Sequence, residues 1–549
     1  MRFLCGSTIF RMEFKSAIAI TQGWLGLAFL GENVVNFRSD LTNAFYFFGY
    51  RSFVAAMLLR IVLITSVFAL AFATHAWAQQ KPDDTAKPKS DDSFLVRFLG
   101  NFFNGSQDIP ESRWPYSSGP PSDLRKFPAP QNSPPFPYGE FQIGGTPTIG
   151  DRNEQTVYPL MKALFDGPDG KWWKDSRIFI SGWIELGGNL STSQNQPGAT
   201  SGALYGNAPY LYSQVPGTLQ LHQADLHVIR LPDTYQTDHI DWGFRIDALY
   251  GQDYRFTTMK GLFSNQLYVN NQQYGYDMPM VYGDLYIPWV AQGMNIRVGR
   301  FISVPDIEAQ LAPDNYMFSH SLLYGYDPYT QVGIMATIKL DKQWTIQFGL
   351  TAGNDVAPWD PDARFSPTAC IQWISASNKD SIYGCANTIN GAQFVPSTGG
   401  GNVNQIVGTW THSFSQTINM ATEAWYMWQK NVPACNGQTN TPGGISLPFG
   451  CAPIPGDTQE WAIVNYLNFQ VSPKDSISIR NEYFDDINGQ RTGIATRYVG
   501  HGIGWTHFFK QNVFIRPEFV YQYALDNPAF QQGTKFTQFV AAADLVIRF

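Results

Sequence analysis

The sequence has few charged residues. Asp, Glu, Lys and Arg make up 15% of its 549 residues, and aromatic residues make up another 15%. A soluble protein carries about 25% charged residues, so part of the surface is expected to face something other than water. The chain has no basic tract, and its net charge is −7. These features exclude a nucleic-acid partner, which needs clustered Lys and Arg.

Long apolar runs are also scarce. The clearest one, Ile61–Ala73, holds 13 residues, whereas a membrane-spanning helix needs about 20. Arg60 precedes this run, and the small residues Ala76 and Ala78 follow it at the spacing of a signal-peptide cleavage site. We therefore interpret residues 57–78 as a signal peptide rather than a membrane-spanning helix.

This interpretation also accounts for the start of the chain. Met57 stands where the short first region of a signal peptide would begin. Residues 1–56 would then be a misassigned upstream extension, and the mature protein would begin at Gln79.

Cysteine is rare as well. Cys5 lies upstream of the predicted cleavage site, and the mature chain keeps Cys370, Cys385, Cys435 and Cys451. An even number of cysteines in an exported protein indicates disulfides, and four cysteines allow three pairings. We expect neighbours in sequence to pair, 370 with 385 and 435 with 451. No CxxC motif or histidine cluster accompanies them, so neither a metal site nor a cofactor is predicted.

Residues 79–176 are predicted to form a proline-rich periplasmic arm. It starts with a charged linker, residues 79–92, and prolines crowd its middle from Pro110 to Pro137. Two short helices are expected in the arm, at Phe94–Phe103 and at residues 157–164.

From Arg177 onward, through residues 177–549, the apolar pattern has a period of two. In RIFISGWIEL, residues 177–186, apolar residues occupy every second position, and the alternation returns at residues 240–250, 332–340 and 344–350. Segments of about ten residues have the length of inclined strands that cross hydrocarbon. Lipid offers no partner to an unpaired backbone amide, so such strands must close into a ring.

An internal repeat and the lengths of the connections set the number of strands. SNKDSI at Ser377 recurs as SPKDSI at Ser472, and WTHSFSQTI at Trp410 recurs as WTHFFKQNV at Trp505, both displaced by 95 residues. We interpret this as a duplicated four-strand unit, which makes residues 369–390 a hairpin. Short polar turns alternate with long loops, as in outer-membrane barrels. The prediction is an all-β, transmembrane antiparallel barrel of 16 strands with both ends periplasmic, or of 14 strands if 369–390 is only a loop.

The last strand carries a pattern of its own. The chain ends on FVAAADLVIRF, in which Phe539, Leu545, Ile547 and Phe549 fall at alternate positions on one face. This resembles the signal by which the barrel-assembly machinery recognises and inserts outer-membrane barrels, and the segment would also be the closing strand. An ordinary edge strand is the alternative.

Three stretches resemble a known family: RIFISGWIELGGNLSTS, DHIDWGFRIDALYGQDYRFT and LYIPWVAQGMNIRVGRFISVPDIEAQLAPDNYMFSHSLLYGYDP. They look like the β-barrel porins described as OmpL-like, and the resemblance extends roughly from Arg177 to Phe549. It implies a porin in the outer membrane of a Gram-negative bacterium, with membrane lipid and small hydrophilic solutes as partners. It leaves open whether the chain forms a homotrimer, and it implies no catalytic residues.

A barrel of this size encloses a water-filled lumen, lined by the face opposite the lipid. By alternation, the charged residues on that face are the basic set Arg177, Arg245, Arg297, Lys339, Arg480, Arg516 and Arg548, and the acidic set Glu185, Asp225, Asp247, Asp284, Glu423, Glu482, Glu518 and Asp544. Seven basic groups against eight acidic ones predict no strong ionic preference of the wall. The alternative is that these residues form charge ladders that stiffen the wall.

The connection from Val304 to Tyr329 differs from the other long loops. It contains Asp306, Glu308, Asp314 and Asp327 without any Lys or Arg. Its apolar residues Ile307, Leu311, Leu322 and Leu323 require burial, which an exposed loop does not supply. We expect it to fold inward and narrow the pore, with its acidic groups across from wall arginines. The alternative is a loop packed on its neighbours outside the pore.

The sequence thus predicts an outer-membrane porin for passive diffusion of small hydrophilic solutes. A structural or adhesive barrel without an open channel is the main alternative. An outer-membrane hydrolase is less favoured because His320 adjoins Ser321 without a GxSxG or HExxH motif. VGHGIG, residues 499–504, lies in a predicted strand with no helix after it, so it is not a nucleotide-binding fingerprint.

Overall fold

The computed structural model describes residues 92–103, 148–150, 156–195, 206–304, 306–391, 403–432 and 456–549. Several predictions lie outside these residues: the upstream extension, the signal peptide with its cleavage site, most of the charged linker, the stretch from Pro110 to Pro137, and the pair Cys435 and Cys451.

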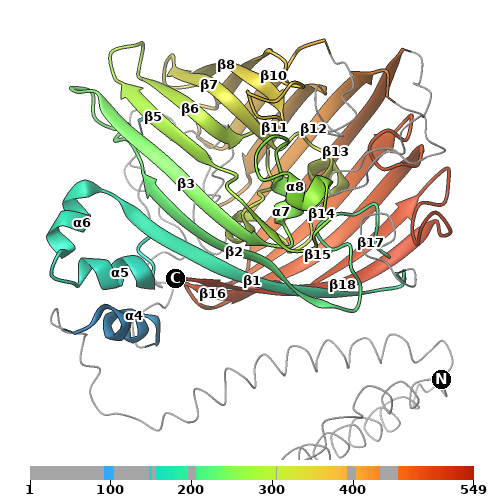
Figure 1. Ribbon diagram of the computed structural model, residues 1–549, viewed down its shortest axis with the longest axis horizontal. Helices are drawn as coiled ribbons and strands as arrows, with labels where there is room; N and C mark the ends of the chain where they lie inside the picture. The colour runs from blue at the N-terminus through green and yellow to red at the C-terminus, as the bar shows by residue number, and fades with distance from the viewer. Residues whose placement is uncertain are drawn as a thin grey trace, which may run out of the picture. The chain divides into compact units, whose positions relative to one another are not determined.

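The described chain from Phe179 onward forms one antiparallel sheet (Figure 1). Its segments are β1 (Phe179–Ser191), β2 (Leu219–Arg230), β3 (Asp241–Gly251), β4 (Gly275–Asp277), β5 (Val281–Ile287), β6 (Met294–Ile302), β7 (Thr330–Lys339), β8 (Trp344–Asn354), β9 (Ser366–Ile374), β10 (Asp380–Asn387), β11 (Asn404–Ser413), β12 (Ile418–Lys430), β13 (Asp457–Gln470), β14 (Asp475–Asp486), β15 (Thr496–Lys510), β16 (Val513–Ile515), β17 (Glu518–Ala524) and β18 (Thr537–Arg548).

The sheet closes on itself as a barrel of 16 strands. β4 and β5 both pair with β3, and β16 and β17 both pair with β15 and β18, so each pair is one interrupted strand and 18 segments make 16 strands. Pro279 and Pro517 stand in the two interruptions, where a residue without an N–H breaks the ladder. β1 pairs with both β2 and β18, which leaves no open edge. Sixteen strands are confirmed, and 14 is wrong because β9 and β10 form a true hairpin.

Connections at the two ends of the barrel differ in length. The turns that follow β5, β7, β9, β11, β13 and β15 are short, whereas the loops that follow β1, β3, β6, β12 and β17 are long. The C-terminus lies at the end with the short turns (Figure 1), which is the periplasmic end of an outer-membrane barrel.

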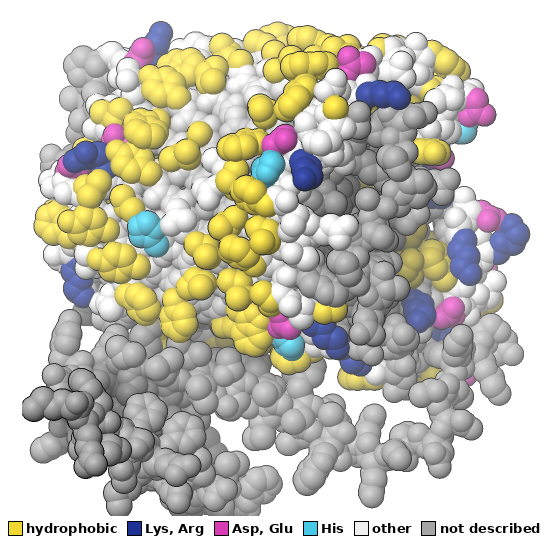
Figure 2. All heavy atoms as spheres, turned by 180° about the vertical axis from the view of Figure 1, so that it is seen from behind, with side chains coloured by type: hydrophobic (Ala, Val, Ile, Leu, Met, Phe, Trp, Pro, Cys, Tyr) yellow, Lys and Arg dark blue, Asp and Glu magenta, His cyan; other side chains and the backbone are white. Residues whose placement is uncertain are grey.

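Outward-facing positions are apolar. Exposed large apolar side chains on the strands include Leu226, Trp242, Val298, Ile334, Phe348, Ile371, Ile406, Ile463, Ile503 and Phe519. Figure 2 shows hydrophobic side chains spread over one side of the outer surface with few charges between them. Such a surface suits lipid rather than water. Within the described ranges, no helix is long and apolar enough to cross a membrane.

The internal repeat is reproduced in the strand register. Asp380 of β10 stands opposite His412 of β11, and Asp475 of β14 stands opposite His507 of β15. Each aspartate oxygen lies close to the histidine Nδ1, at 2.6 Å in the first copy and 2.7 Å in the second. The repeat therefore relates one hairpin to another four strands away, as the 95-residue displacement predicts.

The closing strand meets β1 at the very last residue. The backbone N–H of Phe549 donates to the carbonyl of Gly182 at 2.8 Å, and the N–H of Gly182 donates back at 3.1 Å. A Cβ on Gly182 would stand 2.2 Å from the carbonyl oxygen of Asp225 and 2.8 Å from the ring of Phe549, so the glycine makes room for both.

A disulfide joins Cys370 of β9 to Cys385 of β10, which is the neighbour pairing expected from the sequence. The two residues stand directly opposite each other in the ladder, and both are inward and buried.

Replacing both of these cysteines by serine should lower the free energy of unfolding. The bond closes a loop with a sequence separation of 15, and loops of that length are stabilised by about 3 kcal/mol through lost entropy of the unfolded chain. Urea unfolding with and without a reductant measures the difference. A double variant as stable as the oxidised protein would show that strand pairing alone fixes the hairpin.

Three helices lie in the part of the arm that the structure describes. α4 (Phe94–Phe103) and α5 (Pro159–Phe165) confirm the two helices expected there, and α6 (Gly170–Ser176) adds a third. α5 is joined to the barrel at its periplasmic end, where Met161 Sδ accepts a hydrogen bond from the N–H of Ile180 at 3.4 Å. Within the long loops lie α7 (Tyr254–Thr257), α8 (Asn265–Tyr268), the 3-10 turn η4 (Ala312–Asp314) and α9 (Leu322–Gly325).

Candidate functional site

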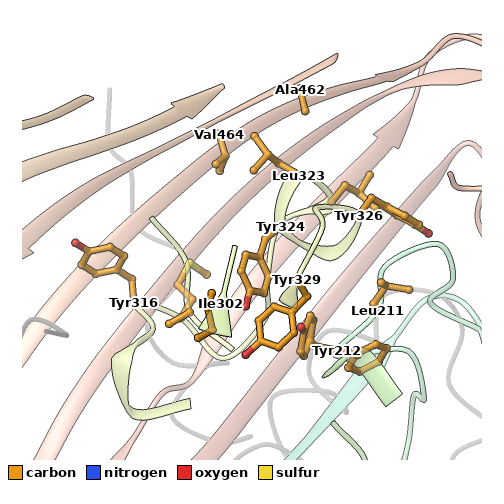
Figure 3. Packing of buried hydrophobic residues seen from close by; sticks show 14 of the residues in the cluster. Leu211, Tyr212, Ile302, Tyr316, Leu323, Tyr324, Tyr326, Tyr329, Ala462 and Val464 are labelled. Carbon is orange, nitrogen blue, oxygen red and sulfur yellow. The ribbon is translucent and has the colours of Figure 1, made fainter. Parts of the chain in front are cut away.

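The loop between β6 and β7 lies inside the barrel. We call its described residues, 303–304 and 306–329, the lumen loop. Leu311, Leu322 and Leu323 are each 1% exposed and belong to the same buried cluster as inward residues of β13. Figure 3 shows Leu323 beside Val464, with Tyr324 and Tyr329 of the loop near each other. The burial that the apolar residues of this loop require is thus supplied by the barrel wall.

Three wall glutamates accept hydrogen bonds from the backbone of the lumen loop. Glu423 of β12 accepts from the N–H of Ile307 at 2.9 Å, and Glu482 of β14 accepts from the N–H of Leu322 at 2.7 Å. Glu518 of β17 accepts from the N–H of Ser319 at 3.1 Å. A carboxylate that accepts from a buried N–H forms one of the stronger hydrogen bonds in proteins. These wall charges therefore hold the loop in place.

Two wall arginines donate to carbonyls of the same loop. Arg480 of β14 donates to the carbonyl oxygen of Ser319 at 2.6 Å. Arg516, in the interruption between β16 and β17, donates to the carbonyls of Ala312 at 2.8 Å and Asn315 at 2.9 Å. Both arginines are at most 1% exposed. Charged wall residues thus bind both backbone N–H groups and backbone carbonyls of the lumen loop.

Glycines on the inner wall make room for the loop. A Cβ on Gly502 or Gly504 of β15 would stand 3.1 Å from the side chain of Met317, and one on Gly187 of β1 would stand 2.6 Å from the ring of Phe318. Glycine is used where another group must approach the backbone closely. The VGHGIG segment, which sequence patterns left without a role, is therefore part of the seat of the lumen loop.

Three of the four acidic residues of the loop take different positions. Glu308 lies 3.8 Å from Arg480 and accepts from the hydroxyl of Tyr466 at 2.7 Å. Asp327 is hydrogen-bonded to Gln405 of β11. Asp306 lies beside the carboxyl of Glu423 instead of an arginine. Of these three residues, Glu308 alone follows the expected arrangement of an acid across from a wall arginine.

Burial raises the pKa of Asp306 well above its ordinary value of 3.8, and the neighbouring carboxylate of Glu423 raises it further. Two adjacent buried carboxyls cannot both ionise without a large cost. Burial also raises the pKa of Asp314 to about 6, although Arg548 and Arg245 oppose the shift.

Acidification is therefore expected to tighten the lumen loop. A carboxyl whose pKa is raised by folding stabilises the folded state below its unfolded pKa, and this stabilisation is lost as pH rises through the folded pKa. The Asp306→Asn variant should exchange the amides of residues 306–327 more slowly than the unmodified protein at pH 7.5, and nearly equally at pH 4, after correction for intrinsic rates. Hydrogen exchange with mass spectrometry measures this.

Asp341→Asn is the matched control for this experiment. Asp341 lies in the turn after β7, where backbone hydrogen bonds from Gln343 and Trp344 lower its pKa. This substitution should leave exchange in the lumen loop unchanged. Equal exchange in Asp306→Asn and unmodified protein at pH 7.5 would contradict the role given to Asp306.

A second loop, residues 206–218 between β1 and β2, packs on the lumen loop. The hydroxyl of Tyr210 donates to Glu482 at 2.6 Å, and Tyr212 is hydrogen-bonded to Gln310. The hydroxyl of Tyr326 donates to the carbonyl of Pro209 at 2.8 Å. Part of the lumen is therefore filled by two loops, a feature that alternation in the strands could not reveal.

Several of the charged residues expected to line the lumen form ion pairs within the wall. Arg297 and Asp284 stand opposite each other on β6 and β5, at 2.9 Å. Arg245 lies 2.8 Å from Asp247 on β3. Arg516 also donates to Asp544 of β18 at 3.1 Å and lies 3.5 Å from Glu185 of β1. Asp225 of β2 lies 3.4 Å from the ring of His227.

The remaining residues of that set lie near the periplasmic end. Arg177 precedes β1, caps α6 in a left-handed conformation and pairs with Asp241, so it belongs to the rim. Arg548, near the end of β18, donates to the carbonyl of Pro313 in the lumen loop at 3.2 Å. Lys339 ends β7 and is 2% exposed.

One sector of the wall carries no charge. In β8, β9 and β10 the described inward residues are neutral, and they include Thr345, Gln347, Thr368, Gln372, Ser381 and Tyr383. The charged wall residues that anchor the lumen loop lie on strands outside this sector, and within the sector Asn387 of β10 donates to the hydroxyl of Ser303 at 2.8 Å. The absence of charge in this sector could be predicted from the strand alternation, but the position of the lumen loop relative to the sector could not.

A closed, lipid-facing barrel of 16 antiparallel strands, with a loop anchored across its inner wall, defines an outer-membrane β-barrel of the porin class. The family model described as "Putative beta-barrel porin-2, OmpL-like" matches residues 177–549. The chain belongs to this family. Among curated proteins, no sequence matches it.

Similar solved structures are distant relatives in sequence. An anion-selective porin from Comamonas acidovorans is 9% identical, covers 68% of this chain and 99% of its own, and has a TM-score of 0.42. The outer-membrane channel DcaP of Acinetobacter baumannii is 9% identical, with 68% and 97% covered and a TM-score of 0.43. OmpT of Vibrio cholerae, solved in a trimer form, is 8% identical, with 68% and 99% covered and a TM-score of 0.39. These scores are too low to support a statement about the activity of this chain.

Proposed function

We propose that the protein is an outer-membrane porin through which small hydrophilic solutes diffuse passively, past a constriction formed by the lumen loop. The observation that carries this proposal is the anchoring of the loop to five charged wall residues: Glu423, Arg480, Glu482, Arg516 and Glu518. A loop fixed in this way narrows the barrel and stays in place while a solute passes. Fixed groups at a constriction select solutes by size and polarity.

The charge distribution favours neutral or weakly charged solutes. Ion pairs such as Arg297 with Asp284 cancel within the wall, and the charges that anchor the loop are buried against it. The part of the wall that has neither ion pairs nor loop-anchoring charges is the hydroxyl- and amide-rich sector of β8 to β10. A narrow passage bordered by such groups should show little preference between cations and anions.

Liposome swelling tests this function. Proteoliposomes with the full chain should swell in a size series of sugars, at rates that fall steeply with solute size, and should admit neutral amino acids. Liposomes without protein give the background. Swelling at the background rate for the smallest sugar would overturn the proposal.

One observation favours a second function, a structural or adhesive barrel without an open channel. Inward side chains on opposite parts of the wall, among them Arg297, Gln347 and Glu423, are at most 1% exposed. A wide aqueous lumen would leave such groups accessible to water. Proteoliposomes that contain folded barrels and do not swell would support this second function.

A hydrolase is not supported by the geometry of His320 and Ser321. Ser321 caps α9, where its hydroxyl accepts from the N–H of Tyr324 at 3.1 Å and is hydrogen-bonded to Glu308. The Nε2 atom of His320 lies 2.9 Å from the carbonyl of Ala309 instead. Burial lowers the pKa of His320 to about 3. The serine is therefore a helix cap, and we propose that the protein is not an enzyme.

The proposed location is the outer membrane of a Gram-negative bacterium, with membrane lipid around the barrel. We further propose that the barrel-assembly machinery recognises the last strand, because Phe549 completes the seam with β1. Association as a homotrimer stays a prediction, and cross-linking of the protein in native membranes tests it.

A further inference from the structure

The helix α4 is oriented with its polar side toward the protein. Its two polar side chains, Arg97 and Asn101, are 6% and 2% exposed. Arg97 donates to the carbonyl of Ala163 in α5 at 3.0 Å, and Asn101 donates to Asp166 at 3.2 Å. A helix on a soluble domain shows the reverse arrangement, with the apolar side packed inward.

The opposite side of α4 is apolar and exposed. The exposed residues of this side are Leu95, Val96, Leu99 and Phe103, at 42% to 61% of their full surface, and Phe94 at the start of the helix is 42% exposed. Phe98 and Phe102, one turn apart, lie on the same side and are partly buried. Among the described residues of this face there is no charged group.

The helix is fixed at the periplasmic rim, next to the lipid-facing surface. Lys510 Nζ, at the end of β15, donates to the carbonyl of Phe103 at 3.1 Å. The preceding residue, Phe509, points outward and is 49% exposed. Trp505, also on β15, points outward too and is 43% exposed. Aromatic residues at such positions form the girdle where barrel and membrane surface meet. The apolar face of α4 thus continues an apolar surface that already faces lipid.

We propose that α4 lies in the periplasmic leaflet of the outer membrane, with its apolar face among the acyl chains. A helix with one apolar face inserts at the boundary between headgroups and acyl chains, parallel to the membrane. Arg97 and Asn101 then attach it to α5, and Lys510 lies at the level of the phospholipid headgroups.

The size of the face favours lipid over a protein partner. A helix of ten residues is about 15 Å long and about 10 Å wide, which gives a face of about 150 Å². A stable protein interface buries at least about 1,200 Å² in total. A second copy of the chain would have to bring much additional surface to this face, whereas a leaflet needs none.

Photo-crosslinking from lipid tests the proposal independently of any channel activity. The full chain is reconstituted in vesicles of phosphatidylethanolamine and phosphatidylglycerol that contain a phospholipid with a diazirine on its acyl chain. After irradiation, mass spectrometry should find lipid adducts on residues 94–103 as well as on outward positions of β15. The segment around Val269, 71% exposed in a long loop at the opposite end, gives the background.

In the Leu95→Glu/Leu99→Glu variant the yield of lipid adducts on α4 should fall about tenfold or more, because a helix with charges on this face does not stay among the acyl chains. Adducts on β15 and the compact band in unboiled gels should stay unchanged, and Val269→Glu is the matched control. Adducts on α4 at the background level in the unmodified protein would overturn the proposal, even if the variant did not fold. So would cross-links from α4 to a second copy or to another segment of the chain in place of lipid.

Discussion

Replacing Arg480 and Arg516 together by methionine is expected to raise the single-channel conductance several-fold. The two side chains hold three carbonyls of the lumen loop, those of Ser319, Ala312 and Asn315. Removing one partner of a buried, charged hydrogen-bonded set costs about 3 kcal/mol. Because 1.4 kcal/mol corresponds to about a tenfold change in an equilibrium, the released loop should leave its seat for much of the time.

Planar-bilayer recording measures the conductance, and protease sensitivity of residues 306–328 provides a second signal. Arg497→Met is the matched control, because Arg497 pairs with Asp526 on the exposed rim, with 48% of its side chain accessible. This variant should conduct as the unmodified protein does. The same conductance and the same protease resistance in the double variant would show that the arginines do not hold the loop.

Deleting residues 545–549 is expected to abolish the folded barrel. These residues pair with β1 from Leu186 to Trp183, and Phe549 adds two backbone hydrogen bonds to Gly182. Without them β1 has an open edge in hydrocarbon, where each unpaired peptide group costs several kcal/mol. The truncated protein should show no compact band in unboiled gels and little β-structure by circular dichroism.

Phe549→Ala separates loss of the strand from loss of the terminal ring. The backbone pair with Gly182 survives this change, so the compact band should be retained. A truncated protein that still migrates as a compact, heat-modifiable band would mean that the seam does not need this strand.

The strands themselves were predictable from the sequence. Lipid on the outside and a polar interior impose a period of two, and the alternation at residues 177–186, 240–250, 332–340 and 344–350 falls on β1, β3, β7 and β8. The weakest hairpin, β9 with β10, was recoverable because its sequence repeats 95 residues later in a clearer one, and Asp380 and Asp475 occupy equivalent places in the ladder.

The roles of the wall charges were not predictable. Alternation places Glu423, Glu482 and Glu518 on the inner face, but it cannot show that their partners are backbone N–H groups that are 116 or more residues away in the chain. A backbone N–H leaves no trace in the sequence. The expectation that wall arginines face acids of the loop therefore captured Glu308 with Arg480 and missed the carbonyls that both arginines hold.

The glycines of residues 499–504 were used in the sequence analysis only to exclude a nucleotide-binding fingerprint. Gly500, Gly502 and Gly504 recur at the strand period on the inner face of β15. Three glycines at that spacing leave a flat strip of backbone, which indicates close approach by another segment. The side chains of Glu482 and Met317 fill that strip.

The most direct test of this account is planar-bilayer recording of the unmodified, full-length protein. A barrel with an anchored, constricting loop predicts discrete conductance steps that are small for a 16-strand porin, with a reversal potential near zero in a salt gradient. Folded protein that gives no steps, neither unmodified nor with Arg480 and Arg516 replaced, would contradict a channel.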